Sequence, residues 1–298
     1  MFDTVRLVGA GPVVGHVADR LDRRVEWTIL QTGSAGHSGR VKNLSVTVSP
    51  NRLNVRGSLT GFLREMGWDG LHPTRQDVRA ARSMLEARLG TDLGQAAVWR
   101  LDVFADLALS SEPSCYLPLL TTKDRFQRSS YDGTSVQFGV KHRQLAFYDK
   151  AAEQERTVTG GLLRYEMRFL KRLTWQMGTP LTFADLHEPT LWVACADKWI
   201  REYESVVKQS EYHLPTGEYS PNEYHTLLAA MAVGPGELIE LHKRQKKAGH
   251  ITKSKYDTAR KNILKALTNP VFASPSIYVE ELDTAVSDAA RLMRDAAV

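Results

Sequence analysis

Short runs of alternating apolar and polar residues fill the first 175 residues, and runs with helical spacing dominate the remainder. Alternation with period two is typical of strands that bury one face, whereas a period near 3.6 is typical of helices. Gly178 and Pro180 interrupt the pattern within the stretch 176–183, as expected at a boundary. The pattern therefore predicts an α+β domain over residues 1–175 and a mostly helical region over residues 176–298.

Turn and stop residues place individual elements within this outline. The stretch 43–57 is typical of a strand, a turn at Pro50 and Asn51, and a second strand. Residues 75–90 carry apolar side chains at helical spacing and end in Gly90, which predicts a helix. Further strands are predicted at 97–109, 134–150 and 162–172, and two further helices at 235–249 and 254–267.

Three of the predicted strands place charged residues on the face opposite their apolar residues. The apolar sets are Trp99 with Leu101 and Val103, Leu145 with Phe147, and Leu163 with Tyr165, Met167 and Phe169. The polar sets are Arg100 with Asp102, Tyr148 with Lys150, and Arg164 with Glu166 and Arg168. If the three strands lie in one sheet, two carboxylates, a phenol and several cations share one surface.

Two explanations of this surface stay open at the level of pattern. Antiparallel sheets often keep one solvated face, whose charges form weak pairs. Alternatively, two carboxylates on neighbouring strands can hold Mg²⁺ or Mn²⁺, which prefer oxygen ligands, and a metal or cation can favour an ionised tyrosine nucleophile. Under the second explanation Lys150 is that cation or stabilises charge on a phosphate, and the chemistry is phosphoryl transfer to Tyr148.

Composition and charge limit the classes of protein that need to be considered. The 298 residues are 42% apolar and 24% charged, with a formal charge of +5 and a pI near 9.1, which is ordinary for a globular protein and suits a polyanionic partner. Cys115 and Cys195 have no metal-binding spacing, so we expect reduced thiols in a cytoplasm. Since no apolar run reaches the ~18 residues of a membrane helix, no membrane partner is expected.

Four segments, taken in order, resemble a known family. They are VTVSPNRLNVRGSLTGF (46–62), VWRLDVFAD (98–106), VKHRQLAFYDKAAEQ (140–154) and LLRYEMRFLKRLTWQMGTPL (162–181). The third contains a Tyr-x-Lys-x-x-Glu motif formed by Tyr148, Lys150 and Glu153. In their order and spacing the segments resemble the replication initiators of filamentous phages, the gene II and gene X type proteins, which are similar to initiators of certain rolling-circle plasmids.

The resemblance implies a Rep-like nicking-endonuclease domain with an antiparallel or mixed sheet. In this family a tyrosine at the position of Tyr148 attacks one strand of the origin. The attack leaves a 5′-phosphotyrosine and a free 3′-hydroxyl that primes rolling-circle synthesis, and the enzyme later rejoins the displaced strand. By the same matching, Asp102 and Glu166 are expected ligands of Mg²⁺ or Mn²⁺, and Glu153 is either a third ligand or the start of a helix.

The same resemblance implies partners and a location. We expect binding to phage or plasmid origin DNA, both double-stranded and single-stranded, and cooperation with a host helicase and replication polymerase in a bacterial cytoplasm.

The chain departs from related nicking enzymes in its histidines. Many of those enzymes carry a His-x-His metal motif, and none of the nine histidines here forms one. Where the phage proteins tend to show Gly-His-Asn after the Ser-Pro turn, this chain has Gly57, Ser58 and Leu59. That loop therefore supplies no histidine ligand. His142 shares the face of Tyr148 if residues 134–150 form one regular strand, although a lone histidine on a strand is more often structural.

Strand cleavage requires cations along the DNA backbone and aromatic rings against unpaired bases. Segment 123–133 interleaves Arg125 and other cations with aromatic residues, and residues 237–265 contain nine Lys or Arg against three Asp or Glu. A solvated loop and solvated basic helices are the ordinary alternatives. The expected DNA-contacting residues are Arg100, Arg164, Arg168, Arg125, Lys243, Arg244, Lys246 and Lys247.

A strand-specific nickase is the main hypothesis, and two others belong to different classes. A non-catalytic, origin-binding regulator of the same fold would bind DNA without forming a covalent adduct. An RNA-binding α+β module is a third hypothesis, although the chain has no RNP-like aromatic motif to support it.

Overall fold

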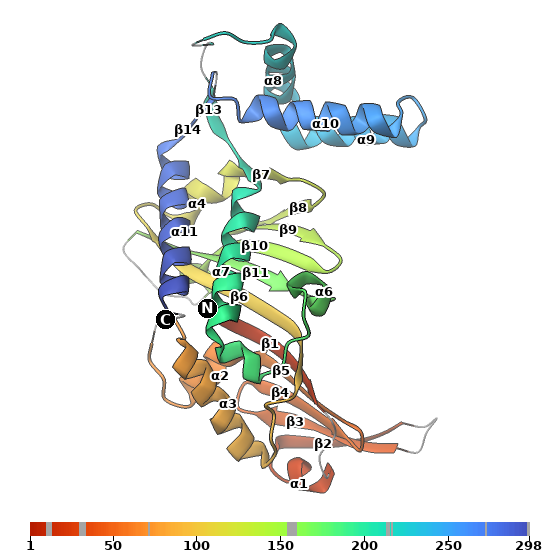
Figure 1. The fold of residues 1–298 in the computed structure, drawn as a ribbon, viewed down its shortest axis with the longest axis vertical. Helices are drawn as coiled ribbons and strands as arrows, with labels where there is room; N and C mark the ends of the chain where they lie inside the picture. Colours follow the sequence, from red (N-terminus) through yellow and green to blue (C-terminus); the bar gives the residue numbers. More distant parts are fainter. Residues whose placement is uncertain are drawn as a thin grey trace.

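The structure is a computed structural model that describes residues 1–9, 14–29, 34–70, 72–153, 160–212, 215, 217–271 and 273–296. Its centre is an antiparallel sheet in the order β2-β3-β4-β5-β1-β6-β11-β10-β9-β8 (Figure 1). The strands of this sheet are β1 (Phe2–Gly9), β2 (Asp22–Ile29), β3 (Ser34–Val41), β4 (Leu44–Ser49), β5 (Arg52–Ser58), β6 (Ala97–Leu109), β8 (Gln127–Tyr131), β9 (Ser135–Val140), β10 (Arg143–Asp149) and β11 (Gly161–Phe169).

Some helices and short strands pack beside the sheet, and α8, α9 and α10 form a group of their own beyond it (Figure 1). The helices are α1 (Val14–Ala18), α2 (Leu59–Glu65), α3 (Arg75–Leu89), α4 (Pro113–Tyr116), α5 (Lys150–Glu153), α6 (Leu173–Met177), α7 (Pro189–Glu204), α8 (Pro221–Val233), α9 (Pro235–Lys247), α10 (Lys253–Leu267) and α11 (Ile277–Asp295). The 3₁₀ turns are η1 (Leu117–Leu119) and η2 (Ala184–His187), and the short strands are β7 (Leu120–Lys123), β12 (Val206–Lys208), β13 (Ser210–Tyr212) and β14 (Ala273–Pro275). The predicted α+β class with a helical C-terminal region is confirmed.

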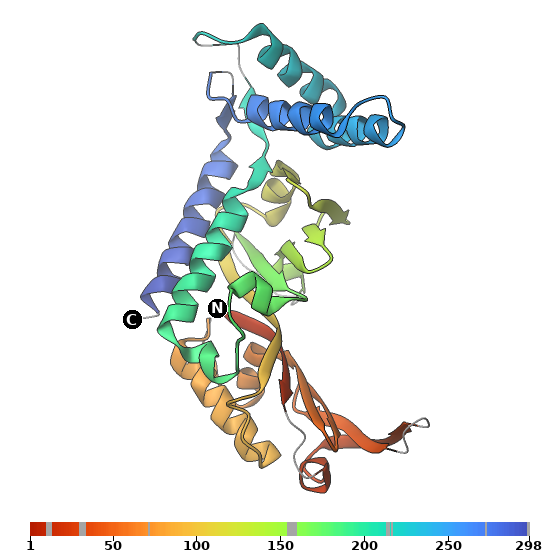
Figure 2. The ribbon, with the colours of Figure 1, turned by 45° about the vertical axis from the view of Figure 1, so that its right-hand side comes forward.

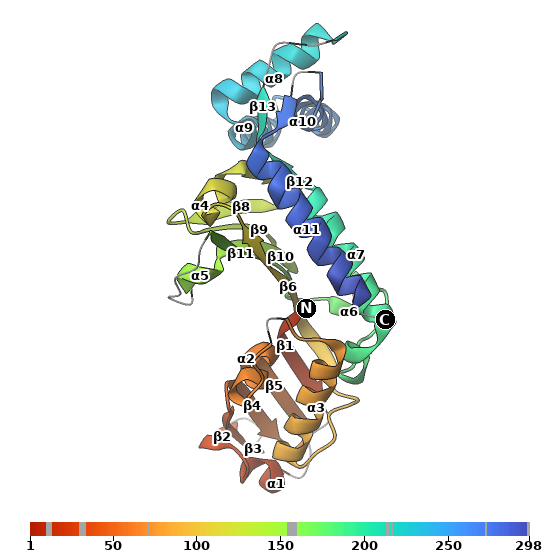
Figure 3. The same cartoon turned by 90° about the vertical axis from the view of Figure 1, so that its left-hand side faces the viewer.

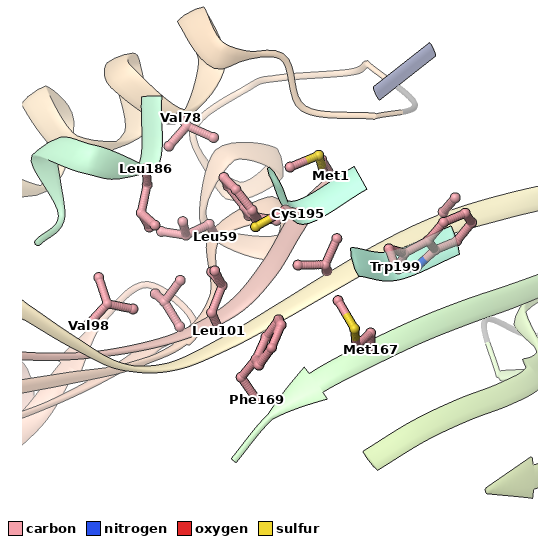
Figure 4. Close-up of a cluster of buried hydrophobic side chains, with 14 of the residues drawn as sticks. Met1, Leu59, Val78, Val98, Leu101, Met167, Phe169, Leu186, Cys195 and Trp199 are labelled. Atoms are coloured by element: carbon pink, nitrogen blue, oxygen red, sulfur yellow. The ribbon is translucent and has the colours of Figure 1, made fainter. Parts of the chain in front are cut away.

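One face of the sheet is apolar and packs against helices. Figure 2 shows α3, α7 and α11 on the same side of the sheet. The ring of Tyr165 stacks on Phe147 at 4.5 Å between centroids and lies 4.4 Å from Trp199 of α7. The Tyr165 hydroxyl donates to the backbone oxygen of Trp199 at 3.0 Å, so this buried phenol is satisfied. Figure 4 shows Leu101, Met167 and Phe169 of the sheet in the same cluster as Cys195 and Trp199.

The predicted elements between residues 43 and 109 are confirmed: β4 and β5 form the hairpin, α3 ends at a left-handed Gly90, and β6 covers 97–109. The single strand predicted over 134–150 is wrong, because the chain turns at Lys141 and His142 and forms the hairpin β9–β10. In one continuous strand the apolar residues Phe138 and Leu145 would point to opposite faces. The hairpin pairs them directly and buries both.

The predicted position of Trp99 on the apolar face is also wrong. Between the pairs Arg6–Arg100 and Leu7–Val98 the register advances one residue on β1 and two on β6, which is a β-bulge. The extra residue lets Val98 point into the core while Trp99 stays 49% exposed. Alternation alone predicts faces correctly only where the strand is regular.

The C-terminal helices divide into two groups with different neighbours. Helices α7 and α11 lie side by side (Figure 3) and share the hydrophobic cluster of the sheet. Helices α8 and α10 bury a second, smaller cluster. The division at residues 175 and 176 remains a prediction, and within the described residues no helix is long and apolar enough to cross a membrane.

Candidate active site

The face of the sheet opposite the helices carries three cross-strand rows of side chains on β10, β11 and β6. The rows are Tyr148–Arg164–Asp106, Ala146–Glu166–Phe104 and Gln144–Arg168–Asp102. Directly opposed residues in antiparallel strands have Cβ atoms about 5 Å apart. The fold therefore brings Tyr148, Glu166 and Asp102 onto one surface, as alternation along the strands predicts. We call this three-strand patch the polar face.

Each carboxylate predicted to bind metal is paired with an arginine two residues away on its own strand. Arg100 donates from Nε and Nη2 to the two oxygens of Asp102 at 3.0 and 2.6 Å. Arg168 donates from the same two nitrogens to Oε2 of Glu166 at 2.9 and 2.6 Å. The acids are 1% and 3% exposed, so the long arginine side chains lie over them.

Asp102 is the acid whose ionisation the site disfavours. The pKa of Asp102 is raised to about 7, mainly by burial and in part by the charge of Glu166, against the opposing effect of Arg100. Two buried carboxylates that repel one another favour a proton or a cation between them. Asp102 is therefore partly protonated near neutral pH.

Tyr148 is half-buried at the end of β10. Burial raises its pKa, and the carboxylates of Glu166 and Glu153 act in the same direction. Arg164 and Arg168 are the cations that lower it. The charge that favours an ionised Tyr148, predicted to come from Lys150, thus comes from arginines of the neighbouring strand β11. Nucleophilic attack by this phenol requires more positive charge than the side chains alone supply.

Lys150 is not on an extended strand with Tyr148, because β10 ends at Asp149 and Lys150 begins α5. Its ammonium lies 5.8 Å from the centroid of the Tyr148 ring and forms an ion pair with Glu153. Glu153 is the last residue of α5, so it lies in a helix but does not begin it. Its carboxylate pairs with Lys150 and not with the other two acids.

Arg164, predicted to clamp a phosphate, is buried and paired. Its Nε and Nη2 donate to the two oxygens of Asp106 at 2.5 and 2.7 Å, and its guanidinium lies 4.1 Å from the ring centroid of Phe104. Asp3 of β1 approaches the same guanidinium at 3.9 Å. Sequence reasoning missed Asp106 and Asp3 as members of this network. Continuing the alternation of β6 to Asp106 would have found the first, whereas nothing in the short β1 pattern points to the second.

The residues described by the structure contain no group of three or more His, Cys, Asp or Glu side chains arranged to hold a metal ion. Asp102 and Glu166 consequently form a two-carboxylate set. Two carboxylates, completed by water and a substrate phosphate, are the usual protein ligands of Mg²⁺. Burial disfavours the ionised form of Asp102 and raises its pKa, and a divalent ion beside it would favour that form.

The two departures in histidine have structural explanations. Ser58, where the phage proteins tend to show histidine, caps α2: its hydroxyl accepts from the Gly61 amide at 2.8 Å and donates to Asp3. His142 lies in the β9–β10 turn, edge-on to Trp175, at the opposite end of β10 from Tyr148. The shared face considered for His142 and Tyr148 therefore does not form.

The other predicted DNA contacts lie away from the polar face. Arg125 is an exposed residue in the turn between β7 and β8, with Asp124 as its neighbour at 3.7 Å. The four basic residues of α9 lie in the separate α8–α10 group: Lys243 pairs with Glu240, Arg244 with Glu237, Lys246 lies over the Tyr256 ring, and Lys247 is exposed.

Comparisons with known proteins give a similarity in structure and none in sequence. No protein-family model and no curated protein sequence matches the chain. Among solved structures, the chain is similar to a rolling circle replication initiator protein from Geobacillus stearothermophilus, with 15% identity and a TM-score of 0.34. The similarity covers 68% of this chain and 84% of that one. An overlap this loose assigns no family.

Proposed function

We propose that the protein is a strand-specific DNA nickase and strand-transferase that initiates rolling-circle replication at an origin. Tyr148 is the proposed nucleophile. Its oxygen forms a bond to phosphorus as the bond to the leaving 3′ oxygen breaks, which gives a 5′-phosphotyrosine and a 3′-hydroxyl. The phenol proton leaves to solvent, and the 3′ oxygen gains a proton.

One observation carries the proposal: Tyr148 lies on the polar face together with two buried carboxylates, and its cross-strand row is next to that of Glu166. A phenol beside a pair of buried carboxylates is the arrangement expected for metal-assisted phosphoryl transfer. The resemblance of the four segments to filamentous phage initiators supports the same assignment.

Asp102 and Glu166 are the proposed ligands of Mg²⁺ or Mn²⁺. A bound divalent ion would supply positive charge that favours the phenolate and a Lewis acid for the phosphodiester. Arg100 and Arg168 hold the two acids. We propose that these arginines turn to the phosphates of the bound strand when the acids take the ion, because a guanidinium binds phosphate with two parallel hydrogen bonds.

The regulator hypothesis also has an observation in its favour. Asp102, Glu166, Glu153 and Asp106 each have a basic partner, and such a set of ion pairs stabilises a buried polar layer without any chemistry. Under this hypothesis the protein binds origin DNA and forms no covalent product, with or without a divalent ion.

An adduct assay separates the two functions. Supercoiled DNA carrying the protein's own origin is incubated with the protein and Mn²⁺ or Mg²⁺, and a protein–DNA band that survives denaturation is sought. Tyr148→Phe is expected to lose the adduct completely and to keep DNA binding, whereas Tyr131→Phe, an exposed tyrosine on β8, is expected to keep both. An equal amount of adduct from Tyr148→Phe would contradict the proposal, and a wild-type protein that binds the origin but never forms an adduct would favour the regulator.

The metal is tested in the same assay. Chelation by EDTA should abolish the adduct of the wild-type protein, and Mn²⁺ should restore it. Asp102→Asn and Glu166→Gln should each require a higher Mn²⁺ concentration for half-maximal adduct, because each removes one negative ligand. Undiminished adduct in EDTA would contradict the metal role while leaving Tyr148 as the nucleophile.

A further inference from the structure

A basic hollow lies next to the polar face, where β1, β5 and β6 meet the start of α6. Its volume is about 480 Å³. The residues that line it are Arg6, Arg56, Val98, Trp99, Arg100, Leu170, Lys171, Arg172, Leu173 and Thr174. These lining residues include five cations and no carboxylate, so the hollow favours an anion.

Trp99 is the aromatic surface of this hollow, and the β-bulge places it there. The ring is 49% exposed, although burial of an apolar ring is favourable. The guanidiniums of Arg52 and Arg6 lie 4.9 and 5.5 Å from the centroid of the ring. An exposed indole held among guanidiniums is a platform on which a nucleic-acid base can stack.

The cations at this platform differ from those around Tyr148 in their pairing. Arg6 donates from Nε to the side-chain oxygen of Asn54 at 3.0 Å, which leaves its charge uncompensated. Among the residues that the structure describes, no carboxylate forms a salt bridge with Arg6, Arg52 or Arg56. Unneutralised arginines beside an exposed ring are available for phosphates.

The hollow and the proposed active site meet at Arg100. In the sheet register, Arg6 of β1 lies opposite Arg56 of β5 and opposite Arg100 of β6. Arg100 in turn donates hydrogen bonds to Asp102. Asp106, which shares the row of Tyr148 through Arg164, is six residues along β6 from Arg100. At about 3.3 Å per residue this separation is about 20 Å. A strand cut at Tyr148 can therefore reach Trp99 within a few nucleotides.

We propose that this hollow binds single-stranded DNA beside the cleavage point, with a base stacked on Trp99 and backbone phosphates on Arg52, Arg56 and Arg172. The identification of the ligand as DNA rests on the proposed function. The strand must be single, because a base can stack on a side chain only after it leaves its partner base. Trp99 and the three arginines are positioning residues, since none of them touches the scissile phosphate.

The first test measures binding of a fluorescently labelled dT12 oligonucleotide. Trp99→Ala should weaken binding about tenfold or more, the usual effect of losing one stacked base, and Trp99→Phe should recover part of the loss. Tyr131→Ala removes another exposed aromatic, on β8, and should bind as the wild type does. Unchanged binding by Trp99→Ala, or an equal loss for Tyr131→Ala, would overturn the proposal.

A second readout reports stacking directly. The oligonucleotide should quench the intrinsic tryptophan fluorescence of the wild type, and Trp99→Phe should remove most of that quenching, whereas Trp175→Phe, an exposed indole on α6, should retain it. Quenching that survives in Trp99→Phe would contradict contact with this ring. Trp99→Ala should weaken binding of a duplex of the same length by less than about twofold. If the variant weakened duplex binding as much as dT12 binding, the assignment to single-stranded DNA would be contradicted.

The arginines are tested through salt dependence. The double variant Arg52→Gln/Arg56→Gln should lower the slope of log affinity against log salt by about 1.4, or about 0.7 for each lost phosphate contact on a single strand. Arg291→Gln, an exposed arginine on α11, should leave the slope unchanged. An unaltered slope in the double variant would contradict phosphate binding at this site.

These measurements separate failure of the inference from failure of the proposed function. If Trp99→Ala binds dT12 normally while wild-type protein still forms the origin adduct, the inference fails and the nickase stands. If Trp99→Ala loses binding while the wild type never forms an adduct, the hollow is confirmed as a single-strand site and the nickase fails.

Discussion

The sheet face that points away from α7 and α11 carries arginines both near Tyr148 and near Trp99, but the two groups differ in burial and in pairing. At the Tyr148 end, the charges of Asp102, Asp106 and Glu166 are buried and each is paired with an arginine. At the Trp99 end, arginines surround an exposed ring, and the lining of the hollow contains no acid. Arg100 belongs to both ends, since it lines the hollow and holds Asp102.

The difference teaches which arginines are available to a ligand. A buried bidentate pair such as Arg164–Asp106 is expensive to separate, so it holds the strands β11 and β6 in place. An exposed arginine beside an indole costs little to reorganise and gains a phosphate readily. An arginine on a surface therefore indicates a phosphate site only if no carboxylate of the protein already pairs with it.

The largest effect is expected from breaking the buried pair. Arg164→Met leaves Asp106 buried without its cation, and the free energy of unfolding should fall by about 3–5 kcal/mol. Urea denaturation measures this loss. The double variant Arg164→Met/Asp106→Leu should regain most of it, because both charges are then absent. A double variant no more stable than the single one would contradict the pairing.

A smaller effect is expected from the pH dependence of Asp102. Its pKa is raised to about 7 in the folded chain, against about 3.9 for an unfolded aspartate. The folded state therefore holds the proton more tightly, and the contribution of Asp102 to the free energy of unfolding declines as pH rises from about 4 to about 7.

Asp102→Asn removes this titration. The stability of the variant relative to the wild type should improve between about pH 5 and about pH 8 by at least about 1.4 kcal/mol, the value of one pKa unit. Denaturation curves at the two pH values, with Asp288→Asn as a surface control, measure the change. A variant whose relative stability declines with rising pH would contradict the raised pKa.

The smallest effect is expected at the Trp99 end. Arg56→Gln should change the free energy of unfolding by less than about 0.5 kcal/mol, because the residue is exposed and no carboxylate among the described residues pairs with it. Urea denaturation of Arg56→Gln and Arg164→Met under the same conditions compares the two losses of unfolding free energy. A loss comparable to that of Arg164→Met would show that the arginines of the hollow are structural.

The sequence pattern predicts the strands and the residues of the polar face, but it does not predict which of these residues form ion pairs. Alternation in β6 and β11 places Asp102 and Glu166 on one face because both strands are regular there. The same rule fails at Trp99, where a bulge depends on the register against β1. It also fails across 134–150, where the change of apolar phase between Phe138 and Leu145 is the sign of a turn.

The state of the site residues depends on neighbours that are distant in the sequence. Arg164 meets Asp106, 58 residues away, and that contact occupies two nitrogens of its guanidinium. Arg164 on the next strand is the cation that lowers the pKa of Tyr148 most, whereas Lys150, two residues on, pairs with Glu153. Short motifs identify candidate residues, whereas the sheet decides which of them remain free to act.

The central claim is that Tyr148 forms the covalent bond to DNA, and mapping the adduct tests it most directly. Origin DNA is cleaved in Mn²⁺, the adduct is digested with trypsin and nuclease, and the peptide that carries the nucleotide is sequenced by mass spectrometry. The account predicts the modification on the peptide Gln144–Lys150, at its single tyrosine. A nucleotide on any other peptide, or a cleaved origin with no modified peptide, would contradict it.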